Sequence, residues 1–241
     1  MKRRLLDFLA ISLGLVLLGG NSAPGGVGRP GRTTLDSVKT EVTARLLAES
    51  ELPESKRSYA DLINYARTTL TIQKANSGPA LSALIEPSTL ALWPRKQVCR
   101  NDKFAVAIDI DPDRKAFDLD DPPLPITGLA STLSELRNEG ITIVWVTSLP
   151  SDGAARLRTT LAASELDVAG SDFLAMASGH ESKHESLRKV AADVCLIAIA
   201  GDRMGDFEQG YEFLRDKSGL IASNLRSNLD NGWFLLPPPL S

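Results

Sequence analysis

Apolar runs alternate with amphipathic stretches along the carboxyl-terminal part of the chain. Four apolar runs predict buried strands and a weaker run predicts a fifth: 104–108, 141–146, 195–200, 233–236 and, weaker, 173–176. Apolar residues recur at helical spacing in the stretches between them: 127–139, 152–164, 182–193 and 204–216. Strands that are apolar throughout and alternate with helices indicate a parallel sheet covered on both faces. We therefore expect an α/β fold.

The residues before position 99 carry a different pattern. Helical spacing occurs over 35–50 and again over 55–75. Three prolines interrupt 77–98, which predicts a short helix followed by irregular chain. We therefore expect a small helical N-terminal region over 34–98, followed by a main domain over 99–241.

The amino terminus has the pattern of a secretory signal peptide. Lys2, Arg3 and Arg4 precede an apolar stretch over 8–18, and small residues follow it up to position 23. The stretch is short for a membrane span, so an uncleaved anchor is the weaker alternative. Residues 24–33 are rich in glycine and proline and predict a flexible linker. We expect an exported protein, periplasmic or secreted, that touches a membrane only through an uncleaved signal peptide.

Charge and cysteine content narrow the class of protein further. The 241 residues carry 27 Lys and Arg against 30 Asp and Glu, a net charge of −3. This charge excludes a nucleic-acid binder that works through bulk positive charge, and 5% aromatic residues argue against stacking platforms. The two cysteines, Cys99 and Cys195, predict either one disulfide or two unrelated core residues.

Two carboxylates follow the first predicted strand of the sheet, Asp109 and Asp111. Ligands of parallel sheets bind at the carboxyl ends of the strands. Two like charges this close raise each other's pKa unless a cation lies between them. The pair therefore predicts either a metal site or a nucleophile beside an acid/base. The alternative is the start of a solvated loop.

The predicted strand over 195–200 leads into a second acidic motif. Gly201 is expected to let the backbone turn sharply, and Asp202 then lies at the same sheet edge as Asp109. Asp206 follows four residues later and could instead cap a helix. Carboxylates that converge in this way favour a divalent cation, and oxygen ligands favour Mg²⁺.

Hydroxyl and amine groups complete the candidate site. Thr147 and Ser148 end the predicted strand over 141–146 and can donate to an anion, or else cap a turn. Lys183 begins a predicted helix, where the helix dipole does not favour a cation, so it is expected to face an anionic site. The next residue, His184, is expected to face solvent.

Taken in order, these motifs resemble those of a known family. The segments AVAIDIDPDRKAFD, IVWVTS, ESKHESLRK, IAIAGDRMGDF and GWFLLPPPL are similar to the exported bacterial acid phosphatases of the haloacid dehalogenase superfamily, to which plant vegetative storage proteins are related. The resemblance covers about residues 97–241. It implies a Rossmann-like sheet in which the strand before Asp109 pairs with the strand before Gly201. Cys99 and Cys195 then share the amino-terminal edge of the sheet, which implies a disulfide.

The resemblance also implies a role for each side chain. Asp109 would be the nucleophile that forms an aspartyl-phosphate, and Asp111 the general acid/base. Thr147 and Ser148 would bind the phosphoryl oxygens of a small phosphorylated substrate. Lys183 would neutralise both nucleophile and phosphate. The implied activity is that of a phosphomonoester hydrolase.

A magnesium site follows from the same resemblance. The residues that would hold the ion are Asp109, Asp111, Asp202 and Asp206. Asp111 would bind it through its backbone carbonyl and the others through their carboxylates.

The chain departs from the family pattern at several positions. Pro112 and Asp113 replace a Glu and a Thr, and Leu149 stands where an arginine is common. The segment after Asp111 leaves little room for the lid that relatives insert there. A catalytically impaired binding or storage-type protein on the same fold is therefore the alternative. A nucleotide-sugar transferase, with Asp109 and Asp111 as a metal clamp, ranks lower because it leaves Lys183 unexplained.

Overall fold

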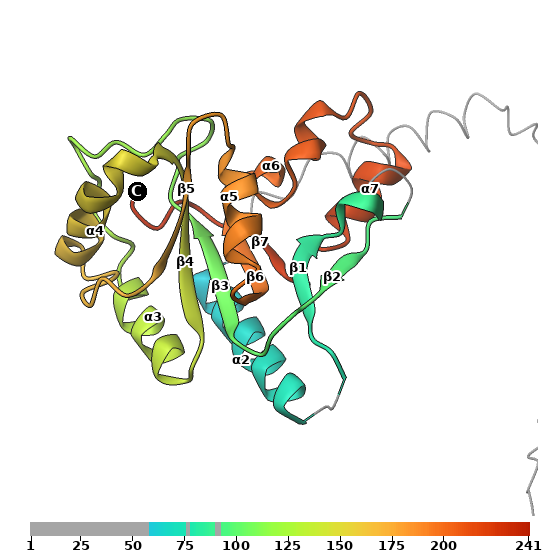
Figure 1. Ribbon diagram of the computed structural model, residues 1–241, viewed down its shortest axis with the longest axis horizontal. Coiled ribbons are helices and arrows are strands. Elements are labelled where there is room, and N and C mark those ends of the chain that lie inside the picture. Colours follow the sequence, from blue (N-terminus) through green and yellow to red (C-terminus); the bar gives the residue numbers. More distant parts are fainter. Residues whose placement is uncertain (1–57, 76–77, 90–92) are drawn as a thin grey trace, which may run out of the picture. The chain divides into compact units, whose positions relative to one another are not determined.

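A computed structural model describes residues 58–75, 78–89 and 93–241 (Figure 1). The predicted signal peptide, the predicted linker and the helix expected over 35–50 lie outside the described residues. None of the helices in the described part has the length and apolar content of a membrane span.

The main sheet has five strands in the order β5-β4-β3-β6-β7, and every neighbouring pair is parallel. The strands are β3 (Phe104–Asp109), β4 (Thr142–Pro150), β5 (Phe173–Ala177), β6 (Cys195–Gly201) and β7 (Trp233–Leu235). All residues of β3 and β6 are buried, as expected for strands with helices on both sides. The predicted parallel α/β sheet is confirmed.

Helices cover both faces of the sheet (Figure 1). Three of them share one hydrophobic cluster with the sheet: α2 (Tyr59–Ala75), α3 (Leu129–Asn138) and α4 (Ala154–Ala163). On the other face, α5 (Lys183–Val190) and α7 (Leu220–Arg226) pack in a second cluster. The strands are apolar on both sides because each side meets such a cluster.

The chain over 77–98 differs from the expected short helix and irregular segment. It contains β1 (Leu81–Ile85), a 3₁₀ turn η1 (Pro87–Thr89) and β2 (Lys96–Val98), and the two strands pair antiparallel. Contacts with the main sheet decide this outcome. The hydroxyl of Ser82 donates to the carbonyl of Leu196 (3.1 Å), and the Trp233 indole donates to that of Ala83 (2.7 Å).

The helix expected over 204–216 is also wrong. The segment forms the short helix α6 (Met204–Phe207) and then the 3₁₀ helix η3 (Gln209–Phe213). Glu208 breaks the helix with φ −146° and ψ 108°, and its carboxylate accepts the N–H of Gly210 at 3.1 Å. Two glycines in this segment lower its helix propensity. Helix α7 was not predicted; it is seven residues long and depends on packing.

A disulfide joins Cys99 to Cys195, with Cα atoms 5.2 Å apart. Cys195 is paired with Phe104 at the amino end of β3 and β6. The implied pairing of these two strands and the implied disulfide are therefore confirmed.

The strand order reverses between β3 and β6. The chain moves outward from β3 to β4 and β5, then returns to add β6 and β7 on the other side of β3. A reversal of this kind leaves a crevice beyond the carboxyl ends of the two central strands, where ligands bind in open α/β sheets.

Candidate functional site

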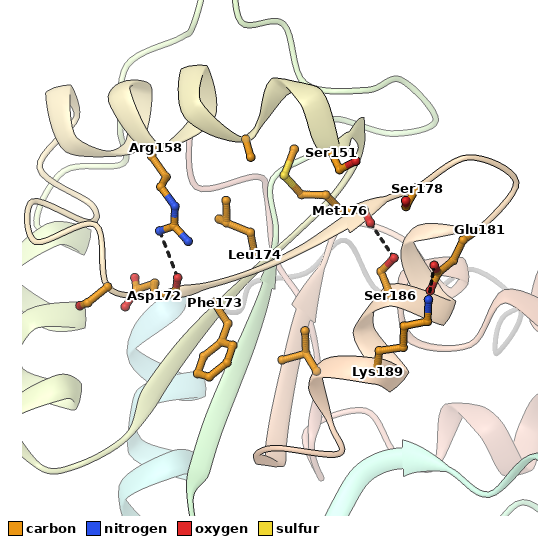
Figure 2. A pocket seen from close by; sticks show the side chains of 13 residues that line it. Ser151, Arg158, Asp172, Phe173, Leu174, Met176, Ser178, Glu181, Ser186 and Lys189 are labelled. Carbon is orange, nitrogen blue, oxygen red and sulfur yellow. Dashed lines mark hydrogen bonds and ion pairs between the residues drawn. The ribbon is translucent and has the colours of Figure 1, made fainter.

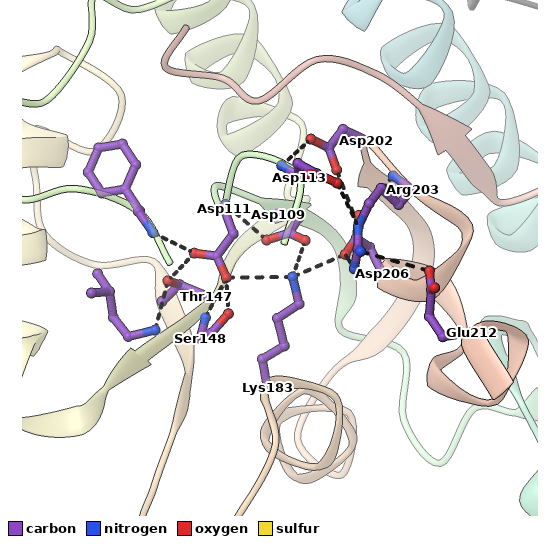
Figure 3. A network of polar contacts seen from close by, with 12 residues as sticks. Asp109, Asp111, Asp113, Thr147, Ser148, Lys183, Asp202, Arg203, Asp206 and Glu212 are labelled. Atoms are coloured by element: carbon purple, nitrogen blue, oxygen red, sulfur yellow. Dashed lines mark hydrogen bonds and ion pairs between the residues drawn. The ribbon is translucent and has the colours of Figure 1, made fainter. Parts of the chain in front are cut away.

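Lys183 and Asp109 form the centre of the site, beyond the carboxyl end of β3 (Figure 3). The Nζ atom of Lys183 lies 2.5 Å from Oδ2 of Asp109, 3.1 Å from Oδ1 of Asp206 and 3.5 Å from Oδ2 of Asp111. The other oxygen of Asp109 accepts the N–H of Asp111 at 3.1 Å. The structure thus brings together an amine and three carboxylates that the sequence predicted for one site.

Lys183 reaches this position because it is the first residue of α5. Ser182 caps the helix by accepting the N–H of Glu185 (3.2 Å), and Glu185 accepts the N–H of Ser182 (2.8 Å). This reciprocal capping box fixes where the helix begins. The side chain of Lys183 is 18% exposed, whereas those of its three partners are at most 3% exposed.

The cluster holds more negative than positive charge. Burial raises the pKa of Asp109 well above its usual value and nearby Asp206 raises it further, against the lowering effect of Lys183. Burial lowers the pKa of Lys183, but the charges of Asp109 and Asp206 outweigh this, so the net shift is upward. Because the carboxylates outnumber the protonated amine, the site favours the binding of a further cation or a proton.

Asp111 occupies a cradle of hydrogen-bond donors, which we call the anion cradle: Thr147, Ser148 and the N–H of Phe117 (Figure 3). Thr147 Oγ1 and the N–H of Ser148 each lie 2.6 Å from a carboxylate oxygen of Asp111, and the Ser148 hydroxyl also donates to it. The N–H of Phe117 donates at 3.1 Å. Thr147 and Ser148, predicted to bind phosphoryl oxygens, therefore bind a carboxylate. The arrangement is suited to an oxyanion.

Asp202 follows β6 and contacts the backbone of Asp113 and the guanidinium of Arg203, whose Nε lies 4.0 Å from Oδ1. Its Oδ2 accepts the N–H of Asp113 at 2.7 Å. Its Oδ1 is buried and has no hydrogen-bond partner among the described residues. Burial raises the pKa of Asp202, and Asp206 raises it further. A buried carboxylate oxygen in this condition is stabilised by a cation.

Asp206 caps a helix, which is one of the two roles that the sequence left open for it, and it also contacts the amine of the site. Its Oδ2 accepts the N–H of Arg203 at 2.9 Å, which caps α6, while Oδ1 faces Lys183. Gly201 matters for space and not for a sharp turn, because it is not among the glycines with positive φ. A Cβ at Gly201 would lie 2.6 Å from the Cβ of Asp206. The glycine therefore lets Asp206 approach the end of β6.

The donor set fits a hard cation such as Mg²⁺. Asp109, Asp202 and Asp206 offer only oxygen atoms, and Oδ1 of Asp202 accepts no hydrogen bond from the described residues. The Asp111 carboxylate is engaged by the anion cradle, which leaves its backbone carbonyl, the atom implied by the resemblance. Within the described residues no group of three or more His, Cys, Asp or Glu side chains is arranged as a metal centre. The ammonium of Lys183 lies among the carboxylates instead.

Arg203 is a charged residue of the site that the sequence analysis missed. Its guanidinium lies within 4.0 Å of carboxylate oxygens from Asp113, Asp202, Asp206 and Glu212 (Figure 3). Its place in the sequence, directly after Asp202, was the available signal. It offsets part of the negative charge at the site.

Asp113 does not crowd the first two carboxylates. Its side chain is 75% exposed, and Oδ1 lies 3.8 Å from Nε of Arg203. The residue has a positive φ of 49°. Its contribution to the site is the backbone N–H that holds Asp202.

The expectation that His184 faces solvent is wrong. The side chain is 9% exposed, and Nε2 lies 3.8 Å from Oε2 of Glu208. Neither ring nitrogen has a hydrogen-bond partner in the described part of the chain. Burial lowers the pKa of His184, although the charge of Glu208 raises it. The hydrophobic cluster on this face of the sheet includes Leu187 of the same helix, so α5 turns His184 inward.

Two of the cavities that adjoin α5 differ in their relation to the site. One of about 300 Å³ is lined by Ser148, Lys183 and Arg203 together with residues of η3, so it lies next to the carboxylate cluster. The other, of about 630 Å³, runs along β5 between α4 and α5 (Figure 2). Its wall contains none of the predicted site residues. The smaller cavity is therefore the one connected with the candidate chemistry.

No model of a known protein family matches the chain, and no curated protein is significantly similar to it. Its function therefore has to follow from the chemistry of the site.

Proposed function

We propose that the protein is a Mg²⁺-dependent phosphomonoesterase of the haloacid dehalogenase type, an acid phosphatase acting through an aspartyl-phosphate on Asp109. The observation that carries this proposal is the contact of 2.5 Å between Lys183 and the buried carboxylate of Asp109, with Asp206 3.1 Å from the same amine. These residues come from three separate segments. Their convergence at the strand-order reversal supports a shared chemical task.

Asp109 is suited to be the nucleophile. Lys183 and the N–H of Asp111 orient its carboxylate, and Lys183 offsets the charge that would repel a phosphate dianion. A carboxylate oxygen of Asp109 attacks phosphorus, and the bond from phosphorus to the leaving oxygen breaks. The leaving oxygen takes a proton from Asp111, which must enter the cycle protonated and is left as a carboxylate by this step. Asp111 then takes a proton from water, whose oxygen attacks the aspartyl-phosphate and releases inorganic phosphate.

The anion cradle is suited to the phosphoryl oxygens. Thr147 and Ser148 now donate to Asp111, so a phosphate that takes these donors releases the Asp111 carboxylate. Asp111 is then free to turn toward the leaving oxygen. Binding of the phosphoryl group and positioning of the acid/base are thereby coupled.

Mg²⁺ would be held by Asp109, Asp202 and Asp206 with the backbone carbonyl at Asp111. When bound, it supplies charge neutralisation for the phosphoryl oxygens. Oδ1 of Asp202, which accepts no hydrogen bond from the described residues, supports this assignment.

We propose that the protein is exported and acts in the periplasm or outside the cell. The basic and apolar pattern of residues 1–23 is typical of a secretory signal peptide. The disulfide between Cys99 and Cys195 is typical of oxidising compartments such as the periplasm. Fractionation of cells that express the whole chain tests the proposal, because retention in the cytosol would contradict it.

The alternative is an impaired, storage-type protein on the same fold. It is favoured by Asp113, which replaces the Thr of the family pattern, and by the occupation of the anion cradle by Asp111. The Asp113→Thr variant discriminates between the two. If this variant gains phosphatase activity that the parent lacks, the impaired-protein alternative is correct.

The decisive experiment is a phosphate-release panel with and without Mg²⁺. We expect release from phosphomonoesters that depends on Mg²⁺ and is lost in Asp109→Asn. Asp152→Asn changes an exposed carboxylate outside the site and is the matched control. Absence of release from every ester, with Mg²⁺ present and the protein folded, contradicts the proposed function.

A further inference from the structure

The wall of the cavity of about 300 Å³ beside Lys183 combines two unlike groups of residues. Lys183 and Ser148 belong to the carboxylate cluster and the anion cradle. Glu212 and Phe213 are contributed by η3. A phosphate held by Lys183 and Ser148 directs its ester oxygen away from Asp109, because attack and departure are roughly in line. We therefore assign the part of the wall formed by η3 to the leaving group.

Glu212 is held as a hydrogen-bond acceptor among cations. Its Oε2 lies 3.2 Å from Nη2 of Arg114 and 3.8 Å from Nζ of Lys217, and its Oε1 lies 3.9 Å from Nη1 of Arg203. Gly205 allows this position, because a Cβ there would lie 2.6 Å from Oε1 of Glu212. The wall thus presents a carboxylate directly beside guanidinium groups.

Phe213 adds an apolar face to the same wall. Its side chain is 77% exposed although it lines the cavity. A single exposed aromatic residue is ordinary on a protein surface. Phe213 follows Glu212 in the same wall, so together they suit a small molecule that has both apolar and hydrogen-bonding groups.

We propose that Glu212 and Phe213 form a leaving-group subsite that takes a polyhydroxylated leaving group, as in a sugar monophosphate. This proposal rests on the proposed phosphatase function and names its substrate class. Neighbouring hydroxyls both donate and accept, which matches a carboxylate flanked by guanidinium groups. The C–H face of a sugar ring covers Phe213. A cavity of about 300 Å³ is at the small end of ligand sites, which suits a single small ring.

The subsite would take over the contacts with the leaving group that relatives make through a lid inserted after the nucleophile motif. The segment after Asp111 is short, whereas α6 and η3 line the cavity directly after the second acidic motif. Substrate selection thus lies in the segment that follows Asp206.

Two variants of the full chain test the subsite, Glu212→Gln and Phe213→Ala. Glu135→Gln and Leu220→Ala are matched controls, because both residues are exposed and neither lines the cavity. The substrates are glucose 6-phosphate, a nucleoside 5′-monophosphate, phenyl phosphate and acetyl phosphate, whose leaving group is too small to reach η3. We expect the highest kcat/KM among the three esters for glucose 6-phosphate.

Each subsite variant should lower the ratio of kcat/KM for glucose 6-phosphate to that for acetyl phosphate by about tenfold, mainly through KM. The control variants should leave this ratio unchanged. A preference for the nucleotide or for phenyl phosphate overturns the sugar assignment. An unchanged ratio in Glu212→Gln and Phe213→Ala overturns the subsite itself.

A binding measurement separates failure of the subsite from failure of the chemistry. Glucose 6-phosphate should raise the Tm of Asp109→Asn in the presence of Mg²⁺, and the added Phe213→Ala change should abolish the shift. No release from any substrate, acetyl phosphate included, contradicts the proposed phosphatase. If the Tm shift is also absent, or insensitive to Phe213→Ala, the subsite is overturned as well.

Discussion

Replacing Lys183 by Met tests whether one amine holds the carboxylate cluster together. The substitution keeps the length and most of the volume of the side chain but removes its charge. In the parent, Nζ of Lys183 lies 2.5 Å from Asp109, 3.5 Å from Asp111 and 3.1 Å from Asp206. The variant leaves these three carboxylates without their shared cation. All three carboxylates are nearly inaccessible to water, so solvent compensates little for the loss.

The size of the effect follows from these distances. With an effective dielectric constant of about 20, each of the three contacts has a gross Coulomb energy of about 5–7 kcal/mol. Protonation and water entry recover much of this, so the net loss should match that for breaking a buried ion pair, about 3–5 kcal/mol. For a domain of this size, such a loss lowers Tm by about 6–20 °C.

Lys189→Met is the matched control. Lys189 lies on the same helix and contacts Glu181 at 2.5 Å, but its side chain is 74% exposed. An exposed ion pair contributes at most about 1 kcal/mol. Thermal and urea unfolding in metal-free buffer measure both variants. Equal stability of Lys183→Met and Lys189→Met at neutral pH would refute the reasoning.

The pH dependence of stability provides a second test of the Lys183→Met variant. Burial and Asp206 raise the folded-state pKa of Asp109 above 3.8, so its ionised form destabilises the fold above that value and the cost disappears as pH falls. Loss of Lys183 removes the main opposing charge and raises this pKa further. The difference in stability between Lys183→Met and the parent should therefore shrink from neutral pH to about pH 5. A difference that widens on acidification contradicts the assigned charges.

Three further predictions concern the metal, the nucleophile and the disulfide. Mg²⁺ at about 100 times its Kd should stabilise the fold by about 2.7 kcal/mol, and Asp202→Asn should remove most of that shift whereas the exposed control Asp216→Asn should not, as calorimetry can measure. Asp109→Asn should abolish Mg²⁺-dependent phosphate release and yet raise Tm in chelator, because it removes one of several crowded buried carboxylates; a lower Tm contradicts this. Reduction of Cys99–Cys195, which are separated by 96 residues, should cost about 2–5 kcal/mol in unfolding experiments, and an unchanged Tm would contradict it.

Strand positions in the main sheet were predictable because their pattern is local and redundant. The apolar run at β3 is too short for a helix and is followed by a polar loop, which leaves one interpretation. The segment at β1 carries an equally short apolar run, but its state depends on pairing with β2 and on packing against the sheet. Nothing within the segment records those contacts, and the nearby prolines favoured a wrong interpretation.

The membership of the site was predictable for a similar reason. Asp109 and Asp202 each follow a buried strand, and parallel strands end at one edge, so the sequence alone predicts that they converge. Lys183 could be added because a cation at a helix start is disfavoured unless it faces an anion. Both arguments use only the direction in which a strand or helix runs, and in a parallel α/β sheet that direction follows from the order of the elements along the chain.

The sequence by itself therefore determined the α/β class, the strands of the main sheet and the edge at which its acidic residues gather. Only the tertiary structure decided which groups pair there: Asp111 with Thr147 and Ser148, Arg203 with four carboxylates, and His184 with the interior. Side-chain pairing depends on distances of a few ångströms between segments that lie far apart in the chain. Such distances are set by the packing of helices on the sheet, which no local pattern encodes.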